Sequence, residues 1–267
     1  MSHILHISDT HFGTEQAEVV EALQAHVREH GADLLVLSGD ITQRARSGQF
    51  AAARAFVDSL PVERRLVIPG NHDLPLYNVL QRFLSPYGNY REAFGDDLEP
   101  IHEDDQLLLI GLNTTHPRRH KDGLVSSSQV QRVCQLLAAS DPAKLRIVVA
   151  HQPFGSMEIS DLSNLQHGAM AALGRWAKAG LDLVMGGHIH LPYVLPLSQQ
   201  YPSLAREIWI VQAGTTLSSR IRGTSPNSFN RIHFQAGGDK RVQVERWDYR
   251  DGAFVAAAHF ELGWPAG

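Results

Sequence analysis

Residues 66–73, Leu-Val-Ile-Pro-Gly-Asn-His-Asp, join a short apolar run to three polar side chains. The first three residues have the length and composition of a buried strand, and the Pro-Gly pair that follows ends it. Asn71, His72 and Asp73 then occupy consecutive loop positions. Because ligands in open α/β sheets bind outside the carboxyl ends of the strands, we expect this loop to carry the chemistry of the protein.

Four other apolar runs, at residues 4–8, 34–38, 147–150 and 183–185, also lead into carboxylate or imidazole side chains. Each run is short enough to be a buried strand. The carboxyl ends of such strands meet at one edge of an α/β sheet, so donors that are distant in sequence can converge on one crevice. The donors at the five strand ends are Asp9, His11, Asp40, Asn71, His151, His188 and His190.

Helical patterns separate the predicted strands. Apolar residues recur at helical spacing over residues 19–27, 50–60 and 169–179, and Ser126 with Gln129 forms a capping-box pattern that opens a further helix. Alternation of strands and helices favours parallel pairing with right-handed crossovers. The first two thirds of the chain are therefore expected to be of the α/β class.

The C-terminal part has a different character. Beyond residue 192 no helical pattern recurs, and short apolar or alternating runs are separated by polar turns. We expect this part to form a meander that packs as a second sheet on the first. Its strands are expected at residues 193–197, 207–213, 228–235, 241–248 and 254–260.

Length and composition fit one globular domain over residues 1–267. Hydrophobic residues make up 43% of the chain, and no apolar run approaches the roughly 18 residues that a membrane span needs. A net charge of −4 gives no reason to expect a nucleic acid polymer as partner. The single cysteine, Cys134, excludes an intrachain disulfide, and no secretory pattern is present. We therefore expect a cytoplasmic protein without a membrane partner.

The donor set combines carboxylate, amide and imidazole groups and contains no thiolate. Such donors suit first-row metal ions, namely Mn, Fe, Zn, Co or Ni. Seven donors are more than one ion needs, so we expect two ions, divalent or of mixed valence. Two ions about 3.5–4 Å apart can share a carboxylate and a hydroxide, which places a nucleophile and two Lewis acids on a phosphorus centre. The predicted chemistry is hydrolysis of phosphate esters.

Five ordered motifs end the apolar runs, namely Asp9-x-His11, Gly39-Asp40, Gly70-Asn71-His72-Asp73, His151 and Gly187-His188-x-His190. Together they resemble the signature of the calcineurin-like metallophosphoesterases. Any one motif arises often by chance, whereas all five in order, each after an apolar run, are specific. The resemblance implies an α/β fold, a four-layer α/β/β/α sandwich of two mixed sheets flanked by helices.

The resemblance also implies a role for each donor. One metal would be bound by Asp9, His11 and His190, the other by Asn71, His151 and His188, and Asp40 would bridge the two. His72 matches the catalytic imidazole of the family, which stabilises transition-state charge or protonates the leaving oxygen. The acid that follows, Asp73, would hold the His72 ring.

Some residues of this chain differ from the motifs of two branches of the family, which limits the branches that the chain can resemble. Purple acid phosphatases have a metal-bound tyrosine where this chain has Gln43, and the residues after Asp40 do not match the protein Ser/Thr phosphatases. The chain resembles instead the compact bacterial branch of class III cyclic nucleotide phosphodiesterases and glycerophosphodiesterases. Gln152 stands where many cyclic nucleotide enzymes of that branch have a histidine, so cyclic AMP is not singled out.

The expected protein is thus a metal-dependent phosphodiesterase of small phosphate esters, such as cyclic nucleotides or glycerophosphodiesters, with a metal-bridging hydroxide as nucleophile. A phosphomonoesterase or nucleotidase on the same site and a non-catalytic protein-binding scaffold are the alternatives. Arg222 is a candidate phosphate clamp or a structural ion pair, and the basic run 118–121 is a pocket wall or a solvated loop tip. Residues 76–94 or the terminal meander could supply a homodimer interface.

Overall fold

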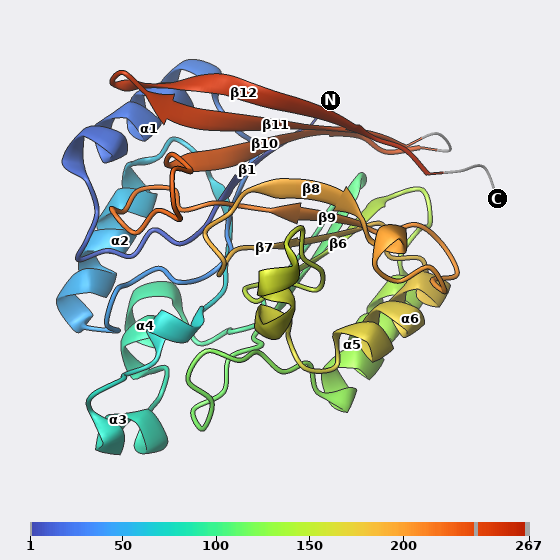
Figure 1. Ribbon diagram of the computed structural model, residues 1–267, viewed down its shortest axis with the longest axis horizontal. Coiled ribbons are helices and arrows are strands. Elements are labelled where there is room, and N and C mark those ends of the chain that lie inside the picture. The colour runs from blue at the N-terminus through green and yellow to red at the C-terminus, as the bar shows by residue number, and fades with distance from the viewer. Residues whose placement is uncertain (1, 238–239, 265–267) are drawn as a thin grey trace.

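Two six-stranded sheets stack face to face, and helices cover their outer faces (Figure 1). The computed structural model describes residues 2–237 and 240–264. Residues 2–67 and 228–262 supply one sheet, and residues 101–212 supply the other. Two mixed sheets flanked by helices confirm the predicted fold class.

The first sheet combines the beginning and the end of the chain. Its strand β1 pairs in parallel with β2, which pairs in parallel with β3, and on the other side β1 pairs antiparallel with β10. From edge to edge the strands are β12 (Ala253–Leu262), β11 (Arg241–Arg250), β10 (Ser228–Gln235), β1 (Ser2–Ile7), β2 (Leu34–Leu37) and β3 (Arg64–Val67).

The second sheet comes from the middle of the chain. Four of its strands run parallel, and an antiparallel strand closes each edge. In order across the sheet the strands are β4 (Ile101–Glu103), β5 (Leu107–Leu112), β6 (Leu145–Ala150), β7 (Leu183–Gly186), β9 (Trp209–Gln212) and β8 (Tyr193–Pro196). The short edge strand β4 has no counterpart among the elements that the sequence predicts.

Three of the described helices lie where apolar periodicity predicts them, and a fourth lies where the capping-box pattern does. The hydroxyl of Ser126 accepts a hydrogen bond from the backbone N–H of Gln129, which confirms the predicted capping box. None of the helices in residues 2–237 and 240–264 combines the length and the apolar character that spanning a bilayer requires. The α-helices are α1 (Ala17–His30), α2 (Ser47–Ser59), α3 (Val79–Leu84), α4 (Gly88–Phe94), α5 (Ser127–Ala139) and α6 (Ala169–Ala179), and the 3₁₀ turns are η1 (Asn71–Asp73), η2 (Ile159–Asn164) and η3 (Leu197–Gln199).

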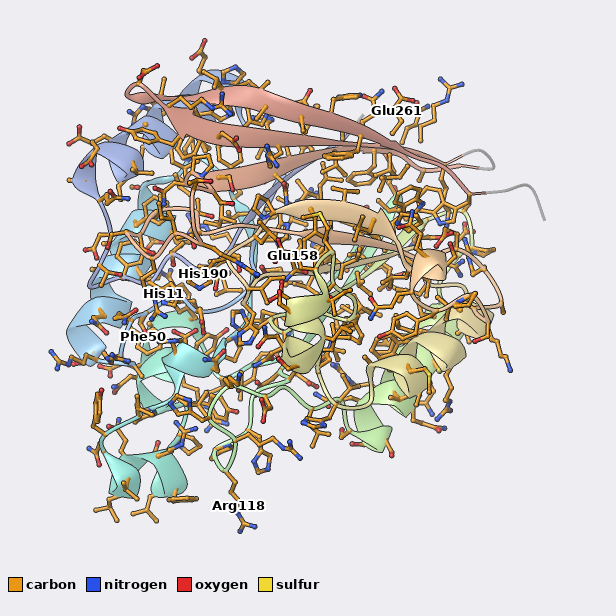
Figure 2. The ribbon with its side chains drawn as sticks, in the orientation of Figure 1. His11, Phe50, Arg118, Glu158, His190 and Glu261 are labelled. Atoms are coloured by element: carbon orange, nitrogen blue, oxygen red, sulfur yellow. The ribbon has the colours of Figure 1, made fainter. Side chains whose placement is uncertain are left out.

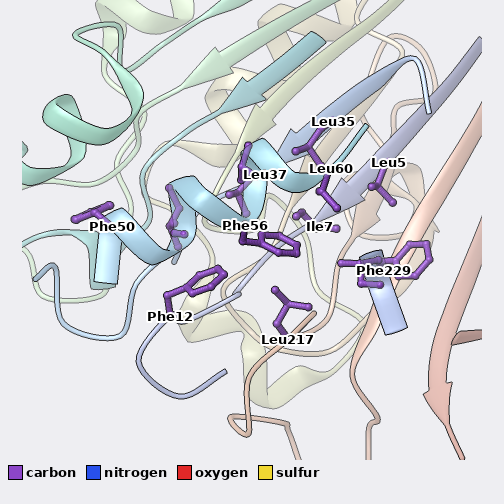
Figure 3. Close-up of a cluster of buried hydrophobic side chains, with 14 of the residues drawn as sticks. Leu5, Ile7, Phe12, Leu35, Leu37, Phe50, Phe56, Leu60, Leu217 and Phe229 are labelled. Carbon is purple, nitrogen blue, oxygen red and sulfur yellow. The ribbon is translucent and has the colours of Figure 1, made fainter. Parts of the chain in front are cut away.

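Side-chain alternation along the strands explains the layers. In β1, Leu5 belongs to the cluster that the first sheet shares with α1 and α2, together with Phe50 and Phe56 (Figure 3). Its neighbour Ile4 belongs to the cluster between the two sheets, which also contains Val149 of β6. Strands that are buried on both faces need apolar residues at every position. The sequence therefore shows continuous apolar runs rather than an alternating pattern.

The C-terminal meander does not form a sheet of its own, and that prediction is wrong. Ile232 of β10 lies opposite Ile4 of β1, so β10 to β12 extend the first sheet, whereas β8 and β9 join the second. The side of β1 that faces away from β2 offers unpaired backbone groups, and a returning strand satisfies them. Strand patterns do not specify which sheet edge a returning strand will pair with.

Candidate metal centre and active site

The carboxyl ends of β1, β2 and β3 in one sheet and of β6 and β7 in the other open at the same end of the sandwich. Side chains from both sheets meet there, and Figure 2 shows His11, which follows β1, close to His190, which follows β7. The structure thus brings the predicted donors together, although the crevice lies between two sheets rather than at the edge of one.

One group of potential ligands consists of Asp9, His11, Asp40 and His190, whose ligand atoms lie within 4.8 Å of one another. Nε2 of His11 lies 3.2 Å from Nε2 of His190. It also lies 3.8 Å from a carboxylate oxygen of Asp9 and 3.8 Å from one of Asp40. Nε2 of His190 lies 3.3 Å from Oδ1 of Asp9. Two imidazoles and two carboxylates therefore surround one small volume.

A second group consists of Asp40, His151 and His188, again within 4.8 Å of one another. Nε2 of His151 lies 3.2 Å from Oδ1 of Asp40. Asn71 lines the same pocket as Asp40 and His188. Since Asp40 belongs to both groups, its carboxylate stands where a ligand shared by two ions would be.

Unpaired buried atoms support a cation site. Oδ1 of Asn71 and Nδ1 of His188 are buried, and neither has a hydrogen-bond partner among the described residues. Buried polar atoms in folded proteins are nearly always paired. An oxygen and a nitrogen left unpaired beside two carboxylates are the donors that a divalent ion would bind, so the residues present fit a pair of metal ions.

The orientation of two imidazoles also fits metal binding. Nδ1 of His151 donates to the carbonyl of Ser38 at 2.9 Å, and Nδ1 of His190 donates to the carbonyl of Arg220. Because a carbonyl only accepts, each Nδ1 carries a proton, and each Nε2 faces the carboxylates, where a metal ion would bind its lone pair in place of a proton. Such a hydrogen bond on the second nitrogen is the usual support of a metal-binding histidine.

The site holds its carboxylates in the anionic form despite complete burial. Burial alone would raise the pKa of Asp40, but the imidazoles of His151 and His72 lower it well below its usual range. Burial alone would lower the pKa of His151, but the carboxylate of Asp40 outweighs this effect and raises the pKa to about 9. Burial lowers the pKa of His188 to about 4, so this imidazole is neutral. Anionic Asp40 therefore stands between a protonated His151 and a neutral His188.

Five of the seven predicted donors have a left-handed backbone conformation. The φ angles are 51° at Asp9, 43° at His11, 47° at Asp40, 75° at His188 and 58° at His190. Residues other than glycine adopt this conformation rarely, at a cost of about 1–3 kcal/mol each, and such residues cluster at functional sites. The strain turns each chain segment sharply at the strand end, so that the side chain points into the crevice.

Glycines beside the donors allow the ligand loops to touch. A Cβ atom on Gly187 would collide with the side chains of Ser8 and Asp9, and a Cβ atom on Gly70 would collide with Asp40. The glycine in each of these motifs is therefore required for the close approach of two loops.

His72 lies in the same pocket, but Asp73 does not hold it, which corrects the expectation from the sequence. Nδ1 of His72 instead donates to the carbonyl of Gln43 at 3.0 Å, which leaves Nε2 free to face the pocket. The ring lies edge-on to that of His11, with 4.8 Å between the centroids. The backbone N–H of His72 donates to Oδ1 of Asp40 at 2.7 Å.

Asp73 is buried, and its hydrogen bonds connect two of the loops that carry potential ligands. Its carboxylate accepts hydrogen bonds of 2.8 to 3.0 Å from the backbone N–H groups of Ile41, Thr42 and Gly70. The hydroxyl of Thr42 donates to it as well, at 2.8 Å. Burial and the charge of Asp40 raise the pKa of Asp73 to about 6. Because both carboxylate oxygens accept these hydrogen bonds, Asp73 influences the position of His72 only through the backbone of the loop.

Arg220 is a candidate functional residue that the sequence did not single out. Its Nη1 lies 3.4 Å from Nε2 of His72 and donates to Oε1 of Gln43 at 2.9 Å. The residue lines the pocket, and no carboxylate of residues 2–237 or 240–264 forms an ion pair with it. The sequence feature that could have identified Arg220 is its position in the polar stretch after β9, two residues before Arg222.

Arg222 lines the pocket too, but its guanidinium is already engaged. Nη1 donates to Asp161 at 2.7 Å and Nη2 donates to Glu158 at 2.7 Å. These contacts are the structural ion pair that the sequence left as one of two alternatives. A phosphate clamp at Arg222 would have to compete with two carboxylates.

The pocket has a volume of about 510 Å³. His120 and Lys121 line it, whereas Arg118 is exposed at the tip of the loop (Figure 2). Gln152 fixes this loop, because its Oε1 accepts from the hydroxyl of Thr114 at 2.5 Å and its Nε2 donates to the carbonyl of Lys121 at 3.1 Å. The basic run is thus a pocket wall at His120 and Lys121 and a solvated loop tip at Arg118.

Comparisons of sequence extend these findings. A family model described as calcineurin-like phosphoesterase matches residues 2–192. No curated protein sequence gives a significant match.

Comparisons of structure identify similar folds. The purple acid phosphatase PPD1 from seeds of yellow lupin (Lupinus luteus) has a TM-score of 0.74 at 14% identity, and the match covers 98% of this chain but 53% of the lupin chain. The chain thus spans about half the length of that protein. A dimetal phosphatase from Danio rerio has a TM-score of 0.69 at 12% identity, with 98% of both chains covered. Vacuolar protein sorting 29 from Cryptosporidium parvum has a TM-score of 0.53 at 13% identity, again covering 98% of both. At such identities the likeness shows the fold.

Proposed function

Because the chain belongs to the calcineurin-like phosphoesterase family, we propose that it is a metal-dependent hydrolase of small phosphate esters, and more narrowly a phosphodiesterase. The observation that carries this proposal is the pair of donor groups that share Asp40, with His72 on the pocket side. Two divalent ions held by these donors would supply Lewis acids and would lower the pKa of a bound water to near neutrality. The metals we propose are Mn, Fe, Zn, Co or Ni.

The protein's own groups would divide the remaining tasks. The guanidinium of Arg220 would bind a nonbridging phosphate oxygen by a charge-assisted hydrogen bond. His72 would stabilise charge on the transition state and, when protonated at Nε2, donate that proton to the leaving oxygen. The carbonyl of Gln43 keeps the ring in the orientation that this transfer needs.

The pocket lining favours a diester over a monoester. Beside the charged groups, Ile189 and Ile221 line the pocket and suit the organic substituents of a substrate. A diester carries one negative charge and has an organic group on either side. Cyclic nucleotides and glycerophosphodiesters are the substrate classes that we propose to test first.

The proposal is tested by hydrolysis of bis(p-nitrophenyl) phosphate with protein that has been stripped of metal and reloaded with manganese. His72→Ala should lower the rate by roughly 10²- to 10⁴-fold, the usual contribution of an acid–base group. Arg54→Ala, an exposed change on α2, is the control and should leave the rate unchanged. Failure of the loaded protein to hydrolyse the diester while binding two ions would show the diesterase proposal to be wrong.

A monoesterase or nucleotidase is the second candidate, supported by the likeness in fold to a dimetal phosphatase. The ratio of diester to monoester turnover on the same preparation separates the two enzymes. A non-catalytic scaffold is a third, supported by the likeness in fold to vacuolar protein sorting 29. A scaffold should be indifferent both to His72→Ala and to removal of metal. We further propose that residues 1–267 act as one domain and that the protein works in the cytoplasm.

A further inference from the structure

Large apolar side chains are exposed together on and beside the short helix α3. Tyr77, Val79, Leu80, Phe83 and Leu84, here called the α3 patch, are between 57% and 76% exposed. They make up five of the twelve exposed large apolar side chains in the described part of the chain, within eight consecutive positions. Single exposed apolar residues are common on soluble proteins, whereas a contiguous group marks an interaction site.

A basic loop, residues 116–121, is clamped against this helix. The guanidinium of Arg82, on the inner side of α3, donates to the carbonyl of Pro117 at 2.7 Å and to that of Arg119 at 2.8 Å. Helix and loop project from the same side of the molecule (Figures 1 and 2), with Arg118 at the loop tip. The clamp therefore presents the apolar patch and the basic loop together.

The surroundings of the patch are positively charged, although the whole protein is not. The chain contains 28 acidic and 24 basic residues, yet residues 74–91 and 106–121 contain no Asp or Glu. In the basic loop the side chains of Arg118 and Lys121 are exposed. The apolar patch thus lies beside the exposed cations Arg118 and Lys121, and the nearest acidic residue in sequence is Asp122, which follows Lys121.

We propose that the α3 patch and the basic loop form a docking surface for an anionic lipid bilayer. Peripheral proteins enter the lipid interface with apolar side chains and gain further from lysines and arginines close to a negatively charged surface. The sequence predicted no membrane partner because no segment can span a bilayer, but peripheral docking needs no such segment.

A second copy of this chain fits the surface less well. A copy docked through the same segments would bring cations against cations, since residues 74–91 and 106–121 offer no carboxylate to pair with Arg118 or Lys121. A bilayer rich in anionic headgroups supplies both the apolar layer and the opposite charge.

The docking surface is continuous with the pocket. Leu76, Arg82 and His120 line a cleft that also contains His72. Docking would therefore place the pocket mouth near the level of the lipid headgroups. Lipid binding does not require hydrolysis, so this inference does not depend on the proposed function.

The test is cosedimentation of the purified protein with two kinds of vesicle, one of phosphatidylcholine alone and one of equal parts phosphatidylcholine and phosphatidylglycerol. The wild-type protein should bind the anionic vesicles, and binding should weaken as salt is raised. Leu80→Ser combined with Phe83→Ser should weaken binding by about tenfold or more. Arg118→Ala combined with Lys121→Ala should weaken it by about 30-fold.

The matched control is Met170→Ser combined with Lys178→Ala on α6, which removes an exposed apolar and an exposed basic side chain from another face and should not change binding. All substituted side chains are exposed, and equal thermal unfolding of the variants verifies their folds. Absence of binding by the wild-type protein, or equal binding by the patch variant, overturns the proposal. So does light scattering that shows a dimer which the patch variant converts to monomers, because the patch is then an interface between copies.

Discussion

At the scale of single residues, the partner of one imidazole nitrogen decides what the other nitrogen can do. His151 and His190 donate through Nδ1 to backbone carbonyls, so Nε2 of each faces a carboxylate. His72 is held through Nδ1 in the same way, but its Nε2 faces Arg220. The same kind of hydrogen bond orients all three rings, but the neighbour of Nε2 differs. It is a carboxylate in the potential metal ligands and Arg220 in the candidate acid.

Arg220→Ala should lower kcat/KM for a phosphodiester by about 10- to 100-fold, because a hydrogen bond from a charged group contributes about 1.5–3 kcal/mol. Arg220→Lys should recover part of this loss. The metal content, measured by elemental analysis, should stay the same, since only the backbone carbonyl of Arg220 contacts His190. The control is again Arg54→Ala. Unchanged kinetics of Arg220→Ala would remove Arg220 from the site.

At the scale of elements, the two ends of the parallel strands have different functions. The carboxyl ends carry the donors, whereas the amino end of β7 carries Asp182, which is fully buried. Its carboxylate accepts from Arg206 at 2.7 Å and from Lys240 at 2.6 Å, and lies 3.7 Å from Arg146. Lys240 precedes β11 of the first sheet and Arg146 belongs to β6 of the second. The network therefore connects the sheets at the end away from the candidate metal centre.

Asp182→Ala should lower the free energy of unfolding by about 3–5 kcal/mol, because it leaves cations in a buried environment without their partner. Urea denaturation measures the change. Asp58→Ala, which breaks exposed pairs with Arg54 and Arg65, is the matched control and should change stability little. If the two variants unfold alike, the buried network does not stabilise the fold more than the exposed ion pairs do.

At the scale of the whole molecule, the candidate metal centre connects the two sheets. Asp9 and Asp40 follow strands of the first sheet, and His151 and His188 follow strands of the second. A ligand that binds only the folded state stabilises it. Ions bound between the sheets would therefore stabilise their packing as well as supply chemistry.

Manganese at about 100 times its Kd should raise the free energy of unfolding by about 2.7 kcal/mol for each site, and a chelator should reverse the effect. Thermal unfolding with and without the ion measures the shift, and calorimetric titration gives the number of sites. Asp40→Asn should abolish most of the shift, since both donor groups share this carboxylate. A Tm that does not respond to manganese would contradict the proposed centre.

The sequence by itself determined most of the elements and the positions of the candidate donors. Helix α6 (Ala169–Ala179) and strand β10 (Ser228–Gln235) have the predicted bounds. Apolar periodicity indicates which face of a helix or strand is buried, and it ends where the element ends. All seven donors stand at strand ends, as the apolar runs indicated. These features are local, so they can be read from neighbouring residues.

Only the tertiary structure decided which distant groups become partners. The edge of β1 that pairs with β10, the bonds of Asp73 to Ile41 and Thr42, and the contact of Arg220 with His72 each join segments far apart in the chain. Periodicity records burial but not the identity of the neighbour, and a carboxylate or guanidinium bonds to whichever group the packed layers bring within about 3 Å. The same packing left the α3 patch exposed, although its residues are as apolar as those of the core.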